Sequence, residues 1–197
     1  MKLYYKPGAC SLASHIALRE AGLPFTLVKV DLATKKTETG EDFFKINPKG
    51  QVPTLQLNDG RILTEGTAIL QYIADLVPEK KLFAPVGDFN RYISLSWLNY
   101  IATELHKGFS PLFRPNSSQE AKDQAITELH KKLAYVDSQL HTEPPYSITD
   151  AYLFTVLRWA TAILKFNDSD YPYLTQYQKT LAQRPAIQAA LIAEGLQ

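Results

Sequence analysis

Cys10 is the only thiol in this 197-residue chain and the side chain best suited to covalent chemistry. It follows the turn Pro7-Gly8-Ala9 and lies just before or within the first turn of an expected helix. The field of a helix N-terminus stabilises a thiolate. A free cysteine is more often a small buried hydrophobic residue, so both interpretations stay open. With no second cysteine, disulfide exchange here requires a thiol from outside the chain.

Ser11 and His106 are the other candidates for chemistry at a sulfur atom. Ser11 is either a helix cap or a hydrogen-bond donor. His106 follows Asn99 by seven residues, two turns of an α-helix, so both would project from the same side, although a helical histidine is usually structural. Lowering a thiol pKa by roughly two units requires about 2.7 kcal/mol. A helix terminus supplies about 0.3–1 kcal/mol and a charge-assisted hydrogen bond about 1.5–3 kcal/mol. We therefore expect the terminus of the first helix and a donor from Ser11 or His106 to act on one sulfur.

Residues 51–66 have the pattern of a hairpin followed by a helix. Thr54–Leu57 alternates like a half-buried strand, Asn58-Asp59-Gly60 is a tight turn, and Arg61–Leu63 returns as a second strand. Pro53 heads the first strand, where its missing N–H costs least. An ordinary surface hairpin without a ligand is the simpler interpretation of this pattern.

Two sets of backbone groups at the ends of this hairpin are candidate ligand-binding features. The amide and carbonyl of Val52 would lie just before the first strand, without partners. The helix that begins near Thr64 or Glu65 has free amides that attract a carboxylate, unless one of these two side chains caps them. Both features would lie at one edge of a sheet.

The elements that position these residues begin with a βαβ unit. Lys2–Tyr5 is a short strand, apolar residues recur at helical spacing from Leu12 to Ala21, and Phe25–Val30 alternates as a second strand. The two strands should be parallel. A polar loop, a short helix, the hairpin and a further helix follow, at residues 31–40, 41–46, 54–63 and 65–76. The order βαβαββα is that of a thioredoxin-like α/β domain.

Every convincing segment after residue 88 is helical. Residues 78–88, which contain two prolines and a glycine, are the expected linker between a domain over residues 1–77 and an all-helical domain over residues 89–197. Ser147-Ile148-Thr149-Asp150 has the spacing of a capping box, with Asp in place of the usual Glu. The run Ala151–Leu164 is apolar nearly all round, as is typical of a helix in the middle of a bundle.

The composition excludes several classes of function. The net charge is +1 and basic residues occur only in pairs, which argues against a nucleic-acid surface. No apolar run approaches the roughly 20 residues of a membrane-spanning helix. A single cysteine favours a reducing compartment, so we expect a cytoplasmic protein. His15, His130 and His141 have no ligand spacing with His106, and we expect no metal site.

Six short motifs, spread over the whole chain, together resemble those of the glutathione S-transferases. Two of the six resemble the bacterial beta class of this family. The four general motifs are Gln51-Val52-Pro53, Glu65-Gly66, the Ser147/Asp150 cap and Arg184-Pro185, and the two beta-class motifs are Pro7–Ser11 and Leu105–Gly108. The resemblance implies a cis bond before Pro53. It also implies that the Val52 backbone pairs with the cysteinyl backbone of glutathione, and that Glu65 and its neighbour hold the γ-glutamyl end.

The resemblance also implies roles for individual side chains. Cys10, Ser11 and His106 would be catalytic, beside the glutathione sulfur, and Lys107 would add positive potential. The implied glutathione-binding residues are Lys35 at the glycine carboxylate, Gln51 at the γ-glutamyl end, Val52, Pro53, Glu65, Gly66 and Lys107, with Asn99 and Glu104 on the glutathione of a partner subunit. An apolar co-substrate would lie against residues that are otherwise core by default: Phe109, Leu112, Phe113 and Trp159.

The resulting hypothesis is a transferase that stabilises the glutathione thiolate and conjugates it to small hydrophobic electrophiles, as in detoxification. A homodimer is expected from the family, with Arg91 in an interface ion pair. One alternative is a glutathione-dependent thiol–disulfide reductase in which Cys10 is the nucleophile. Another is a non-enzymatic interaction module with this fold. Retention of Lys35, Val52-Pro53, Glu65 and Cys10 argues against the module.

Overall fold

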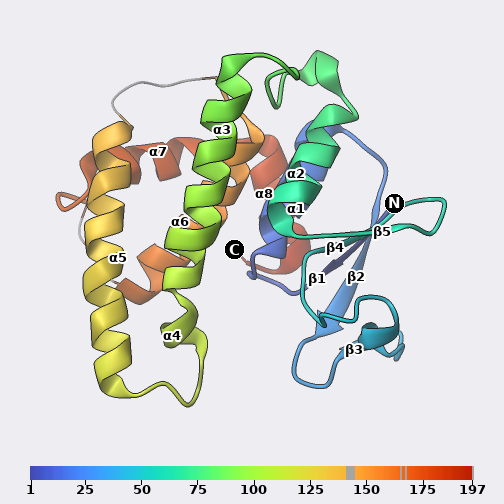
Figure 1. Cartoon of the computed structure of the whole chain (residues 1–197), viewed down its shortest axis with the longest axis horizontal. Coiled ribbons are helices and arrows are strands. Elements are labelled where there is room, and N and C mark those ends of the chain that lie inside the picture. The colour runs from blue at the N-terminus through green and yellow to red at the C-terminus, as the bar shows by residue number, and fades with distance from the viewer. Residues whose placement is uncertain (141–144, 165, 167, 197) are drawn as a thin grey trace.

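A five-stranded mixed sheet with helices packed against it forms the N-terminal part of the computed structural model, which describes residues 1–140, 145–164, 166 and 168–196 (Figure 1). The spatial order is β3-β2-β1-β4-β5. β1 and β2 are parallel, and β4 and β5 form an antiparallel hairpin, so the predicted βαβ unit and hairpin are confirmed. The strands are β1 (Lys2–Tyr5), β2 (Thr26–Asp31), β3 (Lys36–Thr37), β4 (Thr54–Gln56) and β5 (Ile62–Thr64).

The region after β2 differs from the prediction in two places. Within the expected polar loop, β3 pairs antiparallel with β2, with Val30 opposite Thr37. The short helix expected over residues 41–46 is only a three-residue 3₁₀ turn, η1 (Phe43–Lys45). The Asp42 carboxylate accepts a hydrogen bond from the Phe44 amide and starts this turn. The turn does not continue as a helix because Pro48 follows closely and disfavours the helical conformation in the residue before it.

The two faces of the sheet are covered by different elements because side chains alternate along each strand. On β1, Leu3 and Tyr5 belong to the main core, whereas Tyr4 packs on the opposite face with Val30, Phe43 and Val52. The rings of Tyr4 and Phe43 are 5.7 Å apart. The turn η1 therefore delivers one aromatic side chain that closes the second face beside Val52.

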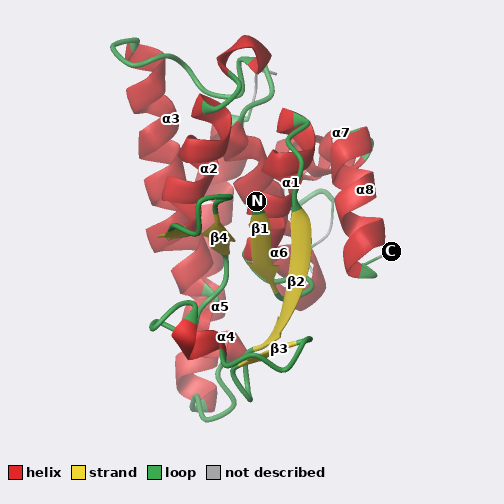
Figure 2. Ribbon diagram, turned by 90° about the vertical axis from the view of Figure 1, so that its right-hand side faces the viewer, coloured by secondary structure: helices red, strands yellow, loops and turns green. Residues whose placement is uncertain are grey.

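Helices α1 (Ser11–Ala21) and α2 (Gly66–Asp75) cover the first face of the sheet (Figure 2). α1 is buried along most of its length because it also packs against α6 and α8 of the helical part. Gly22 ends α1 with a φ of 68°, as its position predicts, and its N–H donates to the Arg19 carbonyl. The start of α1, which carries Cys10, thus lies between the sheet and the helical part.

The C-terminal part is all-helical in the residues that the structure describes, and the predicted two-part fold is confirmed. α6 is buried from Ala151 to Leu157 and contacts α1, α2, α3 and α7, as its apolar run predicts. No helix among the described residues is long and apolar enough to cross a bilayer. The helices are α3 (Phe89–Tyr100), the π-helix η3 (Ile101–His106), α4 (Ser110–Phe113), α5 (Gln119–Gln139), α6 (Ile148–Leu164), α7 (Pro172–Ala182) and α8 (Pro185–Glu194).

The predicted capping box at the start of α6 is present. One Asp150 carboxylate oxygen accepts hydrogen bonds from the Ser147 amide (2.6 Å) and the Ser147 hydroxyl (2.9 Å). The Ser147 hydroxyl in turn accepts from the Thr149 amide at 3.2 Å. The other Asp150 oxygen accepts from the Tyr177 hydroxyl of α7. One carboxylate therefore caps the start of α6 and ties this helix to α7.

The two parts of the chain are joined by more than the predicted linker. Leu82 and Phe83, within residues 78–88, are buried, and the Leu82 carbonyl accepts from the Ile148 amide. The Arg91 guanidinium donates to both Asp75 carboxylate oxygens, at 3.0 and 2.9 Å. The interface role expected for Arg91 is therefore wrong, because its charge is paired within the chain. The division into 1–77, 78–88 and 89–197 stays a prediction.

Replacing Asp150 by Ala should lower the free energy of unfolding by about 2–4 kcal/mol, because it removes a helix cap and leaves the buried Tyr177 hydroxyl without its acceptor. Urea unfolding followed by circular dichroism measures this. Asp168→Ala is the matched control. Asp168 is exposed and pairs with Lys179, so its loss should cost less than about 1 kcal/mol. Equal losses for the two variants would contradict the assigned role of Asp150.

Candidate active site

A pocket lies where the starts of α1, β4 and α2 meet the π-helix η3. It brings together many of the predicted residues from both parts of the chain. It also adds residues that the sequence analysis missed. Its predicted lining residues are Cys10, Gln51, Val52, Pro53, Glu65, Gly66, His106 and Lys107, and the added polar ones are Asn47, Lys49, Thr64, Thr67 and Tyr152.

Val52 presents its main chain to this pocket. The Val52–Pro53 bond is cis, as predicted, and β4 begins only at Thr54, so Val52 lies outside both neighbouring ladders. Its carbonyl accepts from the Cys10 thiol at 3.2 Å, and no main-chain group of the described residues is hydrogen-bonded to it. Asn47 and Thr54 side chains both donate to the Gln51 carbonyl at 2.9 Å and hold this segment. The pair Asn47-Pro48, which directly follows the short helix expected over residues 41–46, was the available signal for Asn47.

The N-terminus of α2 opens into the same pocket without a side-chain cap, so neither Thr64 nor Glu65 caps it. Its first amides therefore remain available to an anion. Glu65 has a φ of 69°, and a non-glycine residue there costs of the order of 1–3 kcal/mol, a strain typical of ligand sites. The Lys49 ammonium lies 2.6 Å from the Glu65 carboxylate and 3.0 Å from the Thr64 hydroxyl. The position of Lys49, immediately before Gly50 and the predicted site residue Gln51, was the signal that could have identified it.

Of the two interpretations of Cys10 that the sequence left open, the structure favours a buried, neutral thiol over a thiolate. Burial raises the pKa of the Cys10 thiol to about 11, and this effect exceeds the opposing effects of the local backbone amides and of Lys107. The protonated thiol donates to the Val52 carbonyl, which further suits the neutral form. The helix field is present at this position, but desolvation is the larger effect.

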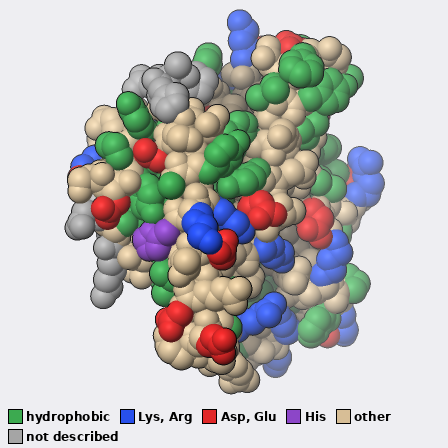
Figure 3. Space-filling model, turned by 60° about the vertical axis from the view of Figure 1, so that its left-hand side comes forward, with side chains coloured by type: hydrophobic (Ala, Val, Ile, Leu, Met, Phe, Trp, Pro, Cys, Tyr) green, Lys and Arg blue, Asp and Glu red, His purple; other side chains and the backbone are tan. Residues whose placement is uncertain are grey.

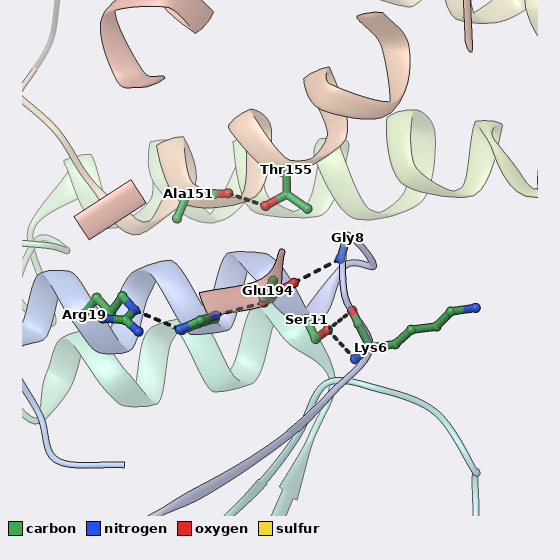
Figure 4. Close-up of polar contacts among 8 residues, drawn as sticks. Lys6, Gly8, Ser11, Arg19, Ala151, Thr155 and Glu194 are labelled. Atoms are coloured by element: carbon green, nitrogen blue, oxygen red, sulfur yellow. Dashed lines mark hydrogen bonds and ion pairs between the residues drawn. The ribbon is translucent and has the colours of Figure 1, made fainter. Parts of the chain in front are cut away.

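Ser11 faces away from the pocket. Its fully buried hydroxyl donates to the Lys6 carbonyl and accepts from the Lys6 amide, each at 3.2 Å (Figure 4). It is therefore neither the N-cap of α1, which is Cys10, nor a donor in the pocket lining. This hydroxyl fixes the turn that precedes Cys10.

His106 ends the π-helix η3, and its Nδ1 lies 2.7 Å from the Tyr152 hydroxyl of α6. Burial, with a smaller contribution from the Lys107 ammonium, lowers the pKa of His106 to about 4, so the ring is neutral at pH 7. A π-helix has more residues per turn than an α-helix, so the seven-residue spacing from Asn99 no longer places both on one side. Asn99 is exposed and lies outside the pocket lining.

Two other predicted glutathione-binding residues lie outside the pocket lining. The Lys35 ammonium donates to the Gly50 carbonyl at 2.8 Å, beside Gln51. The Glu104 carboxylate pairs with the Lys132 ammonium of α5 at 2.9 Å. Lys35 thus contacts the residue next to the pocket-lining Gln51, whereas Glu104 is paired within the helical part.

Of the four predicted apolar residues, only Trp159 has a ring contact with His106, and none of the four is among the residues that line the pocket. Phe109 is fully buried, Phe113 is half exposed, and the Trp159 ring lies 5.0 Å from the His106 ring. Leu112 is partly buried against the main core. Phe109 is therefore a core residue, and an apolar molecule can reach Phe113 without displacing the core.

The turn before Cys10 is held from both sides by the helical part. The Trp159 indole N–H donates to the Gly8 carbonyl at 2.8 Å. Figure 4 shows the second contact, in which the Glu194 carboxylate accepts from the Gly8 amide at 2.9 Å. Gly8 has a φ of 70°, which the Pro-Gly pair predicts. Both contacts were missed, because they join residues that are far apart in the sequence.

No three His, Cys, Asp or Glu side chains of the described residues gather closely enough to hold a metal ion. His141, one of the histidines considered for a metal site, lies outside the described residues.

Comparison with known proteins supports the assignment to a family. The family models described as "Glutathione S-transferase, N-terminal domain" and "Glutathione S-transferase, C-terminal domain" match residues 8–76 and 100–185. Glutathione S-transferase GstA of Escherichia coli O157:H7 is 56% identical over the full length of both chains. The chain belongs to the glutathione S-transferase family.

Solved structures of this family superpose closely on the chain. A sphingomonad glutathione S-transferase complexed with glutathione has 48% identity and a TM-score of 0.94, with full coverage of both chains. The bacterial beta-class glutathione S-transferase of Sphingomonas chungbukensis has 48% identity and a TM-score of 0.95, also over both whole chains. The predicted resemblance to the bacterial beta class is therefore confirmed.

In the protein without glutathione, the rate of Cys10 alkylation by iodoacetamide should still be rising at pH 10.5 without a plateau, because burial raises the pKa of the thiol to about 11. Mass spectrometry of samples quenched between pH 7 and 10.5 gives the rates, and this thiol is the only one in the chain. The urea-unfolded chain is the control, with a midpoint near the value of about 8.5 for a free thiol. A midpoint at or below that value in the folded protein would show that the helix field exceeds burial.

Proposed function

We propose that this chain is an enzyme that binds glutathione in the Val52 pocket, favours its thiolate and transfers the sulfur to small hydrophobic electrophiles. The observation that carries the proposal is the pair of main-chain groups at Val52, outside both ladders and next to an uncapped helix N-terminus. A relative complexed with glutathione has the same fold at 48% identity, which supports this ligand. Detoxification of such electrophiles is the general role that this activity implies.

Each part of glutathione has a matching group in this proposal. The cysteinyl backbone pairs with the amide and carbonyl of Val52 as an added strand residue. The γ-glutamyl carboxylate meets the free amides of α2, and its ammonium displaces Lys49 from Glu65. Gln51 assists at this end, and Lys35 releases Gly50 to bind the glycine carboxylate.

The sulfur would then lie near Cys10, His106 and Lys107. His106 is neutral at pH 7 and serves as a hydrogen-bond donor, while the Lys107 ammonium adds positive potential. A charge-assisted hydrogen bond contributes about 1.5–3 kcal/mol to a thiolate, most of the roughly 2.7 kcal/mol that a two-unit fall in pKa requires. Ser11 contributes only by holding the turn. The electrophile would lie against Phe113, Leu112 and Trp159.

The proposed assembly is a homodimer in which Asn99 and Glu104 approach the partner's glutathione. Large hydrophobic side chains are exposed at and before the start of α3, namely Val86, Phe89, Tyr92 and Ile93, and such a patch suits a second copy. Figure 3 shows groups of hydrophobic side chains on one face, between charged ones. Sedimentation equilibrium tests this, and a monomer at micromolar concentration contradicts it. A cytoplasmic location is proposed, since a single cysteine suits a reducing compartment.

The function is tested with glutathione and a chlorinated nitrobenzene, for which turnover should saturate in both substrates. Glu65→Gln should raise KM for glutathione by about 10-fold or more, because it removes a charge-assisted contact, while kcat stays within a few fold. Glu128→Gln is the matched control, since Glu128 pairs with Lys131 on the surface. Absence of turnover above the uncatalysed rate would contradict the proposal.

The reductase alternative is tested in the same preparation. Cys10→Ala should leave conjugation measurable, because His106 remains as a donor, and should abolish exchange with a glutathione mixed disulfide. Exchange that depends on Cys10, in a wild-type protein that shows no conjugation, would favour the reductase. Undetectable glutathione binding by calorimetry would favour the interaction module.

A further inference from the structure

The contact between His106 and Tyr152 is not used by the function proposed above. Tyr152 belongs to α6, its side chain is almost entirely buried, and its hydroxyl lies 2.7 Å from His106 Nδ1. The two rings meet edge to face, at 84° with centroids 6.0 Å apart. Trp159, about two helical turns further along α6, packs edge to face with the same imidazole. Two residues of α6 therefore hold His106 in one orientation.

The hydrogens of this pair can be assigned by counting donors and acceptors. A neutral imidazole carries one N–H, on either Nδ1 or Nε2. If Nδ1 carried it, the Tyr152 hydroxyl would accept, and its own hydrogen would need a second acceptor. Among the described residues Nδ1 of His106 is the only hydrogen-bond partner of this hydroxyl. An unpaired buried donor costs about 1–3 kcal/mol, so the hydroxyl donates to Nδ1.

This assignment of the hydroxyl hydrogen determines whether the other ring nitrogen of His106, Nε2, is a hydrogen-bond donor or acceptor. With Nδ1 as the acceptor, the hydrogen of the neutral ring is on Nε2. Nε2 has no hydrogen-bond partner among the described residues, and His106 lines the pocket together with Cys10. An N–H stabilises a sulfur anion, whereas a nitrogen lone pair in the same place would repel it.

We propose that Tyr152 is a positioning residue that fixes the tautomer of His106, so that Nε2–H is the donor offered to the sulfur of bound glutathione. The part that concerns the sulfur rests on the proposed function, and the tautomer itself does not. Tyr152 acts only through His106 in this proposal and does not itself touch the sulfur.

The other described histidines provide internal references. His15 has the opposite tautomer, because its Nε2 accepts from the Arg19 Nε–H at 2.8 Å and its Nδ1 lies 2.8 Å from the Glu194 carboxylate. His130 Nδ1 also lies 2.7 Å from a tyrosine, Tyr171, but that hydroxyl has a second acceptor in the His130 carbonyl. Donor counting therefore decides the tautomer of His106 and not that of His130.

The first test is nitrogen NMR of the full chain labelled with ¹⁵N-histidine, at pH 7 and without glutathione. His106, assigned by its loss in His106→Gln, should show a protonated Nε2 and an unprotonated Nδ1. Tyr152→Phe should produce a mixture of tautomers or a switch to Nδ1–H, and the control Tyr171→Phe should leave His106 unchanged. A wild-type Nδ1–H tautomer, or an unaltered tautomer in Tyr152→Phe, overturns the proposal. If Tyr152→Phe does not fold, the wild-type spectrum decides alone.

The second test is a double-mutant cycle on conjugation kinetics. Tyr152→Phe should lower kcat by about 10-fold with KM for glutathione within 2-fold, and it should have no further effect in a His106→Gln background. A packing role would instead multiply the two losses, and that result overturns the proposal. If wild type shows no conjugation, the proposed function fails, and the NMR result still decides the tautomer.

Discussion

The site depends on one main-chain constraint, which is that Val52 stays outside the sheet. Both sides of β4 are occupied, by β1 and β5, so an incoming extended molecule can pair only with the residue before the strand. Asn47 and Thr54 hold the Gln51 carbonyl, and the cis bond to Pro53 completes the turn. In the proposed function, a peptide-like ligand would be recognised there by backbone geometry, and the surrounding side chains would supply the charges that select it.

Burial has opposite effects on two sulfur atoms in such a pocket. The Cys10 sulfur donates to a carbonyl, and desolvation keeps it protonated. A ligand sulfur beside a neutral imidazole and an ammonium would have donors instead, and each of these interactions is stronger where water is excluded. The same low-dielectric surroundings that suppress the Cys10 thiolate would therefore strengthen the hydrogen bonds to a ligand thiolate. In the proposed function, the donor groups, and not the helix field alone, would decide which sulfur is reactive.

Local patterns predicted most of the fold and about half of the pocket. The capping box at Ser147 and Asp150, the parallel strands and the cis bond all depend on short-range chemistry or on a resemblance carried by contiguous motifs. The differences between prediction and structure have physical reasons. The π-helix changed the phase between Asn99 and His106. At Cys10, where the sequence left two interpretations open, burial exceeded the helix field. Lys49 and Tyr152 were missed because their partners come from other elements. For Tyr152 the sequence did contain a signal, because a tyrosine in an apolar helix needs a partner for its hydroxyl.

Gly8 also links the site to the order of synthesis. Its amide is held by Glu194, which lies 186 positions later, and its carbonyl by Trp159. At ribosomal rates of about 5–20 residues per second, roughly 10–40 s separate the emergence of these partners. During that interval the sheet and α1 are present without α8. A nascent chain therefore carries its thiol on a turn that Ser11 holds and Glu194 does not yet hold, and the last contact to this turn forms only after residue 194 has left the ribosome.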